Sequence, residues 1–127
     1  MITVGYSTRE HKPEFIEYLK KSSGYKKINV IEKINNGEKV IVEFWAPWCG
    51  PCKMMKPLFE SVSNKLKQEN SNVQLVTFNI ESDRQLVGQL GIRSVPTIKG
   101  FMNGNEVFTE IGLKDTNLIM EMTKQLA

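Results

Sequence analysis

The sequence predicts an α/β domain built around a mixed β-sheet, and three observations support this prediction. From residue 40 onward, the hydrophobic pattern runs strand, helix, strand, helix, strand, strand, helix, an order that favours parallel strands joined by crossover helices. Residues 40–46 form a nearly continuous apolar run, which is typical of a strand buried on both faces. Asn103-Gly104-Asn105 separates the strand-like residues 97–102 and 106–111 and predicts a hairpin, which adds antiparallel strands.

The first 39 residues give weaker patterns. Residues 2–5 are a candidate edge strand. Residues 13–21 are a candidate helix, because a proline begins the segment, glutamates lie early and lysines lie late. Residues 29–36 are consistent with a helix capped by Asn29, with a glutamate three positions later. A strand over residues 28–31 is the alternative.

The segment that follows residue 52 has a helical pattern, in which apolar side chains recur every three to four residues. Pro57 lies inside this pattern and predicts a kink. The apolar face is predicted to consist of Met54, Met55, Leu58, Phe59, Val62 and Leu66.

Two further elements complete the predicted order. Residues 74–80 are predicted to form a second buried strand, and residues 83–90 a short helix that ends at Gly91. Asp115 is suited to cap a last helix. The apolar face of that helix is predicted to consist of Leu118, Ile119, Met122 and Leu126.

Composition and charge exclude several classes of protein. At 127 residues the chain is long enough for one domain with its own core. Its net charge is +3, and residues 1–27 hold the whole excess, since residues 28–127 carry eleven basic and eleven acidic side chains. This distribution provides no basic face for a nucleic acid. No apolar stretch approaches the ~18 residues of a membrane span, and the first residues lack the apolar core of a secretory signal. We therefore expect a cytoplasmic protein that binds neither nucleic acid nor membrane.

The chain has only two cysteines, Cys49 and Cys52. A disulfide between them would close a very short loop and restrain the unfolded chain little, so a purely structural bridge is a poor explanation. Zinc requires four ligands, and beyond this pair the chain offers a single histidine, His11. Redox chemistry is the remaining explanation.

The position of the pair predicts a different role for each cysteine. A strand that turns directly into a helix puts Cys49 at the helix N-terminus, where unpaired N–H groups and the helix dipole stabilise a thiolate and lower the thiol pKa. Cys52 lies one turn further along the helix and is expected to be less exposed. We therefore predict that Cys49 attacks a substrate disulfide and that Cys52 resolves the mixed disulfide. Pro51 stiffens the turn between them.

Residues 44–54, Phe-Trp-Ala-Pro-Trp-Cys-Gly-Pro-Cys-Lys-Met, are similar almost residue for residue to the active-site segment of thioredoxins. The similarity continues through residues 91–97, Gly-Ile-Arg-Ser-Val-Pro-Thr, and covers roughly residues 38–127. It implies the thioredoxin fold, a central mixed β-sheet flanked by helices on both faces. We assign residues 28–127 to this domain and residues 1–27 to an N-terminal extension.

The resemblance implies further site residues. Pro96 would follow a cis peptide bond and pack against the two sulfurs, which would leave the backbone of Val95 able to pair with a substrate peptide. For Ile80 and Val95, simple burial in the core is an equally good explanation. The substrate-docking surface that the resemblance implies consists of Trp48, Gly50, Pro51, Ile80, Ser94, Val95, Gly112 and Leu113.

Glu43 lies in the middle of the apolar strand, where an unpaired charge is costly. Members of the family carry a buried acid at this position, which implies that Glu43 accepts the proton of Cys52. Burial is expected to raise its pKa. The alternative is a glutamate that faces solvent at a sheet edge. Where many members place a lysine partner for the acid, this chain has Thr77.

These features predict a dithiol–disulfide oxidoreductase that reduces disulfides of protein substrates through a redox-active Cys49–Cys52 disulfide, with no bound cofactor and no metal. The alternatives are an oxidant or isomerase domain of the protein disulfide isomerase type and a thioredoxin-fold binding subunit. Pro51 argues against the isomerase, because isomerases usually carry histidine at that position. The chain has no G-x-G dinucleotide fingerprint. The resemblance implies that a thioredoxin reductase, which uses NADPH and flavin, supplies the electrons. We expect a monomer.

Overall fold

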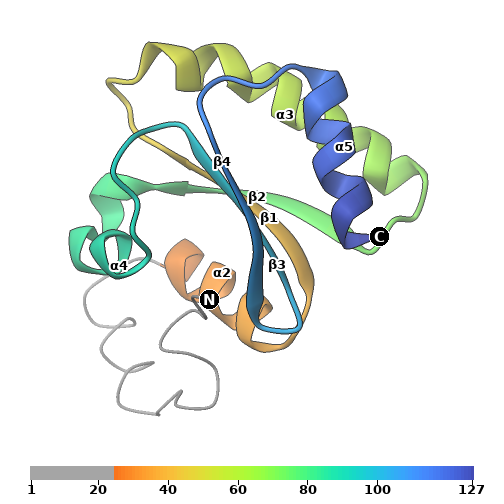
Figure 1. Cartoon of the computed structure of the whole chain (residues 1–127), viewed down its shortest axis with the longest axis horizontal. Coiled ribbons are helices and arrows are strands. Elements are labelled where there is room, and N and C mark those ends of the chain that lie inside the picture. The colour runs from red at the N-terminus through yellow and green to blue at the C-terminus, as the bar shows by residue number, and fades with distance from the viewer. Residues whose placement is uncertain (1–24) are drawn as a thin grey trace.

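A computed structural model describes residues 25–127. The strand predicted at residues 2–5, the helix predicted at residues 13–21 and His11 lie outside the described residues. Four strands form one sheet in the order β2-β1-β3-β4, with α3 and α5 on one face and α2 and α4 on the other (Figure 1). This arrangement confirms the predicted mixed sheet with helices on both faces. No helix within residues 25–127 is both long and apolar enough to cross a membrane.

The central strand is β1 (Lys39–Trp45). It pairs in parallel with β2 (Val73–Asn79) and antiparallel with β3 (Thr97–Met102). Its residues 40–44 are at most 2% exposed, which confirms the prediction of a strand buried on both faces. A second buried strand was predicted for residues 74–80; β2 forms there, but its predicted burial is wrong. In the described part of the chain β2 pairs with β1 alone, and most of its side chains are only partly buried.

The helix α3 (Gly50–Gln68) follows β1 and continues through Pro57. Two residues of its predicted apolar face lie elsewhere, because Met54 is 62% exposed and Leu58 is only partly buried. At about 100° per residue, Met54 lies well outside the stripe that faces the sheet. That stripe consists of Cys52, Met55, Phe59, Val62 and Leu66.

The segment before β1 is a helix, α2 (Tyr25–Asn35), so the strand alternative for residues 28–31 is wrong. Asn29 lies inside this helix and does not cap it. The boundary predicted between residues 27 and 28 also falls inside α2. The helix forms because Val30, Ile31 and Ile34 recur at helical spacing and pack on the sheet as part of one core cluster.

The last two helices are both present, and each begins directly after an aspartate. α4 (Arg84–Gln89) begins after Asp83, whose carboxylate accepts a hydrogen bond from the Leu86 N–H at 3.0 Å. It is preceded by a short 3₁₀ turn, Ile80–Ser82, that the sequence did not predict. Gly91, which follows α4, has the left-handed φ of +75° expected after a helix end.

α5 (Thr116–Leu126) begins after Asp115, whose carboxylate accepts a hydrogen bond from the Leu118 N–H at 2.9 Å. Leu118 itself was predicted to belong to the apolar face, but it is 50% exposed. It lies in the first turn and to one side of the stripe that contacts α3 and the sheet. That stripe consists of Ile119, Met122 and Leu126.

The predicted hairpin is present and joins β3 to β4 (Asn105–Ile111). Asn103 and Gly104 have φ values of +57° and +80°, the conformation that Asn-Gly favours in a two-residue hairpin turn. A bulge interrupts the pairing between Gly100 and Phe101. There Gly100 lies opposite Phe108, and a Cβ atom added to Gly100 would lie 2.3 Å from the Phe108 ring. The aromatic ring therefore occupies the space that a larger residue would need.

This close approach gives a stability prediction. We expect Gly100→Ala to lower the free energy of unfolding by about 1–3 kcal/mol, because the ring must shift in a packed environment. Gly88→Ala in α4 is the matched control. Its Cβ would meet nothing within 4 Å, and alanine favours the helix, so it should be neutral or stabilising by about 0.5–1 kcal/mol. Urea denaturation measures both, and equal stabilities for the two variants would contradict the packing argument.

Candidate active site

The turn from β1 into α3 positions the two cysteines. The Cys49 N–H donates a hydrogen bond to the Ala46 carbonyl at 3.1 Å, which tightens the connection. Cys49 is the N-cap of α3, with extended backbone angles. Its sulfur therefore lies at the helix N-terminus, where the sequence placed it and where backbone N–H groups point toward negative charge.

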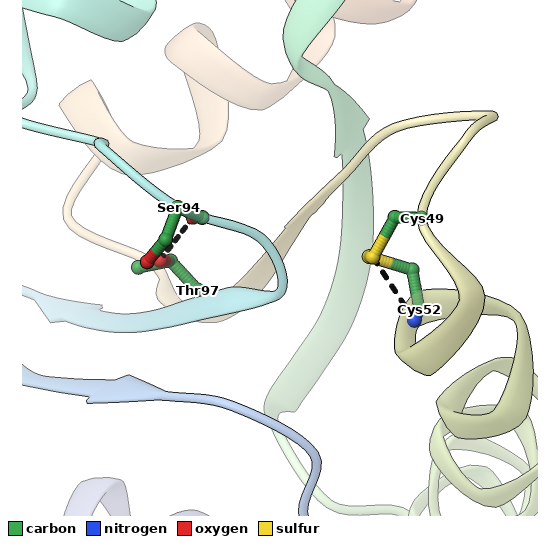
Figure 2. The surroundings of a disulfide bond; sticks show 4 residues. All are labelled: Cys49, Cys52, Ser94 and Thr97. Carbon is green, nitrogen blue, oxygen red and sulfur yellow. Dashed lines mark hydrogen bonds between the residues drawn. A yellow bond between two sulfur atoms is a disulfide. The ribbon is translucent and has the colours of Figure 1, made fainter.

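Cys49 and Cys52 form a disulfide with an S–S distance of 2.15 Å and a Cα–Cα distance of 5.3 Å (Figure 2). The Cys49 sulfur also accepts a hydrogen bond from the Cys52 N–H at 3.1 Å. The residues are 4% and 3% exposed, so the expected difference in exposure is absent from the disulfide form. What distinguishes the two sulfurs is the backbone donor at Cys49, a consequence of its N-cap position.

The loop between Ser94 and Thr97 turns toward the disulfide (Figure 2). Its Val95–Pro96 peptide bond is cis, in agreement with the expectation from the resemblance. Two hydrogen bonds hold the loop. The Thr97 hydroxyl donates to the Ser94 carbonyl at 2.7 Å, and the Gly112 N–H donates to the Pro96 carbonyl at 2.9 Å. The first residue of β3 and the residue after β4 therefore both hold the loop in shape.

The eight residues of the expected docking surface differ in exposure. Trp48 is 66% exposed and Leu113 is 42% exposed. Gly50, Pro51 and Ser94 are exposed, and Gly112 is partly buried. Ile80 and Val95, for which core burial was the alternative, are partly buried and pack against a cluster formed by Ala46 and the two cysteines. They contact the disulfide cluster and still retain exposed surface.

Two residues near Trp48, Glu81 and Arg84, were not predicted from the sequence to belong to the site. The Trp48 indole N–H donates to the Glu81 carboxylate at 2.8 Å, a contact between residues 33 positions apart that no local pattern indicates. A pocket of about 260 Å³ adjoins this pair, and Arg84 and Ile80 are among its lining residues. Thr97 was also missed, and its only sequence signal is its place directly after Pro96 in the second motif.

Glu43 lies in the core, in the middle of β1. It is 2% exposed, so the alternative of a solvent-facing edge glutamate is wrong. It lies on the same face of β1 as Ile41, which packs against α3. One carboxylate oxygen, Oε2, is buried and has no hydrogen-bond partner among the described residues. Desolvation raises the pKa of Glu43 to about 7, an effect that the attraction of Lys56 on α3 opposes.

Thr77 is the β2 residue opposite Glu43 in the strand register, and it is exposed. It carries no charge, so the positive charge that acts on Glu43 comes from the helix and not from the neighbouring strand. A carboxyl group that titrates near neutral pH can accept and return a proton at physiological pH.

Within residues 25–127, no group of three or more His, Cys, Asp or Glu side chains is arranged to hold a metal ion. A cysteine pair, a cis-proline loop and a buried acid together can carry out thiol–disulfide exchange and the proton transfer that accompanies it.

Comparison with known proteins agrees with this chemistry. The family model described as Thioredoxin matches residues 20–125. The thioredoxin of Rickettsia felis is 39% identical over 90 residues, which cover 71% of this chain and 83% of that protein. The thioredoxin of Porphyra purpurea is 40% identical over 81 residues, which cover 64% of this chain and 73% of that protein. Among solved structures, the thioredoxin of Malassezia sympodialis has a TM-score of 0.69 at 30% identity and covers 83% of this chain and 90% of its own.

The raised pKa of Glu43 predicts a pH-dependent stability. The pKa is about 7 in the folded state and near 4.5 in the unfolded state, so the folded state binds more protons between these values. The associated stability is fully present below pH 4.5 and is lost as pH rises through 7. We expect the free energy of unfolding of the disulfide form to fall by about 3 kcal/mol between pH 5 and pH 8. Glu43→Gln should flatten this slope in urea titrations, and an identical slope in the variant would contradict the assignment.

The attraction of Lys56 for Glu43 gives a second prediction. Lys56→Met removes a charge that favours the carboxylate, so the pKa of Glu43 should rise above about 7. The side-chain carboxyl carbon of Glu43, followed by NMR across the pH range, measures the change. Lys65→Met, which removes the same charge near the far end of α3, should leave the Glu43 titration unchanged. If both variants titrate like the original protein, the interaction does not operate.

Proposed function

The chain belongs to the thioredoxin family, and from this premise we propose that it reduces protein disulfides, with Cys49 as the nucleophile and Cys52 as the resolving cysteine. Family membership and the Cys49–Cys52 disulfide establish a dithiol–disulfide oxidoreductase. The observation that carries the assignment of roles is the position of Cys49 as the N-cap of α3, where its sulfur accepts a backbone N–H.

The proposed reaction begins with the reduced dithiol. The Cys49 thiolate attacks one sulfur of the substrate disulfide, which forms a Cys49–substrate bond and releases the other substrate sulfur as a thiolate. The Cys52 thiolate then attacks the Cys49 sulfur. This step forms the Cys49–Cys52 disulfide and releases the second substrate sulfur. Two electrons pass from the dithiol to the substrate, and the protons of the dithiol end on the two substrate thiols.

Glu43 is proposed to accept the proton of Cys52 in the second step. It lies on the face of β1 that α3 covers, and Cys52 is the first residue of the stripe that α3 buries. A pKa of about 7 makes its carboxylate available as a base near neutral pH. Pro96, which follows a cis peptide bond, is proposed to complete the site, and the backbone of Val95 is proposed to pair with an extended substrate segment.

Substrates are proposed to dock on the surface formed by Trp48, Gly50, Pro51, Ile80, Ser94, Val95, Gly112 and Leu113. This surface is uncharged and partly apolar, which suits an extended protein segment on either side of a cysteine. An isomerase-type role is less well supported, since Pro51 supplies no imidazolium to stabilise the dithiol form. A role in binding alone would not need two cysteines within bonding distance.

The electron donor and the setting are also proposals. The dithiol must be regenerated by two electrons, and the chain has no G-x-G segment for a dinucleotide. We expect a thioredoxin reductase with NADPH and flavin to supply them to a cytoplasmic, monomeric protein.

The roles of the two cysteines are tested by trapping. Cys52→Ser can form the Cys49–substrate bond but cannot release it, so it should accumulate stable mixed disulfides when incubated with oxidised insulin or another disulfide protein. Non-reducing gel electrophoresis detects these adducts, and dithiothreitol should release them. Cys49→Ser is the matched control and should form few. Adducts in the control and none in Cys52→Ser would reverse the assignment, whereas adducts in neither would reject it.

A further inference from the structure

The pocket beside Trp48 extends the docking surface toward α4. Its floor is apolar, since Ile80, Val87 and Ile92 line it, and its volume is about 260 Å³. The rest of the lining is Trp48, Gly88 and two charged residues, Glu81 and Arg84. Figure 1 shows α4 at the same end of the sheet as the beginning of α3, where the disulfide lies. A segment docked on the disulfide therefore has this pocket within reach.

The two charged groups of the pocket are not equivalent. The Glu81 carboxylate is already engaged, because it accepts the Trp48 indole N–H at 2.8 Å. Arg84, the first residue of α4, is exposed, and its side chain makes no hydrogen bond or ion pair with any other residue in the range 25–127. A guanidinium group presents a planar set of donors that matches a carboxylate with two parallel hydrogen bonds. The pocket therefore combines an apolar floor with an available cation at its rim.

Other exposed charges around the disulfide have the same sign. Lys53 follows Cys52 directly, and Arg93 directly precedes Ser94, and both are exposed. With Arg84, three exposed cations therefore lie directly beside the cysteine pair, Ser94 and the pocket, together with the anion Glu81. Residues 28–127 as a whole are neutral, so these cations are a local grouping and not part of a general positive charge. A local excess of positive charge attracts acidic partners and raises their association rates.

We propose that Arg84 is a specificity-determining residue, which pairs with an acidic side chain near the cysteine of the bound disulfide segment, so that this protein prefers disulfide substrates with acidic flanks. The inference rests on the proposed function, because it concerns substrates that dock beside the Cys49–Cys52 pair. The bound partner is one class of molecule, a protein segment with a disulfide and a nearby carboxylate.

The test uses three disulfide-bearing peptides that differ only in whether the residues flanking the cysteine are acidic, neutral or basic. The reduced protein is mixed with each peptide, and rapid quenching gives the second-order rate constant. We expect the acidic peptide to react about five times faster than the basic one, the size of a favourable exposed ion pair. This ratio should approach one in 1 M salt, where charges are screened within about 3 Å.

Variants distinguish the effect of Arg84 on the charge preference from the effect of the protein's net charge. Arg84→Gln should lose at least half of the preference, and Arg84→Glu should lower the acidic-to-basic ratio further. Lys65→Glu makes the same change of charge on the exposed side of α3 near its far end and should keep the original ratio. A ratio near one in the unmodified protein, or an unchanged ratio in both Arg84 variants, would overturn the inference.

The neutral peptide distinguishes this failure from failure of the proposed function. If the unmodified protein reduces the neutral peptide and shows no charge preference, it is a disulfide reductase without the specificity proposed for Arg84. If it reduces none of the three peptides, the proposed function fails, and the inference fails with it.

Discussion

The burial of the central strand β1 is the constraint on which the rest of the structure depends. Residues 40–44 are almost inaccessible to solvent, because a strand pairs on each side and a helical layer covers each face. A strand held in this way has one direction and one register. The short turn that follows it can therefore deliver Cys49 to the start of α3 in a fixed position. The placement of the disulfide is a consequence of core packing.

The same strand carries Glu43, and the burial of this carboxyl group is costly when it is ionised. An ionised carboxylate in the core is costly, and the protein reduces this cost by favouring the protonated form near neutral pH. Hydrophobic residues at this position would pack with less difficulty. Retaining an acid is the kind of local compromise that functional sites make at the expense of stability. Lys56, on α3, lowers the pKa of Glu43 and so opposes the effect of desolvation. On the neighbouring strand β2, the residue opposite Glu43 is the uncharged Thr77.

Around the disulfide, apolar and charged groups are separated in space. The proposed docking surface has no charged residue, whereas Lys53 and Arg93 directly adjoin its residues and the cysteine pair in the sequence and Arg84 lines the pocket beside Trp48. In protein recognition, buried apolar contact supplies most of the affinity, while charges at the rim chiefly affect selection and association rate. Two hydrogen bonds hold the loop before β3, which carries Ser94 and Val95 of the proposed docking surface, in one shape. A preformed surface avoids the entropic cost of ordering a loop on binding.

Local features were predicted well from the sequence, because neighbouring residues decide them. The cap at Asp115, the turn at Asn103 and the order of strands and helices all depend on side chains within a few positions of one another. The cysteine pair could be interpreted because its spacing and its place after an apolar strand determine its chemistry. Only the tertiary structure decided which side of each helix faces the core, and Met54 and Leu118 were therefore misplaced. An apolar residue at helical spacing belongs to the core only if another element covers it.

The other features that could not be predicted from the sequence are also contacts between distant parts of the chain. The hydrogen bond from Trp48 to Glu81, the pocket beside Arg84 and the action of Lys56 on Glu43 each require two elements to approach in space. The sequence by itself determined the chemistry of the site, since residue type and local spacing specify a thiol pair at a helix start. The path of the chain decided which charges surround that pair, because electrostatic interactions depend on distance in space and not on separation along the sequence.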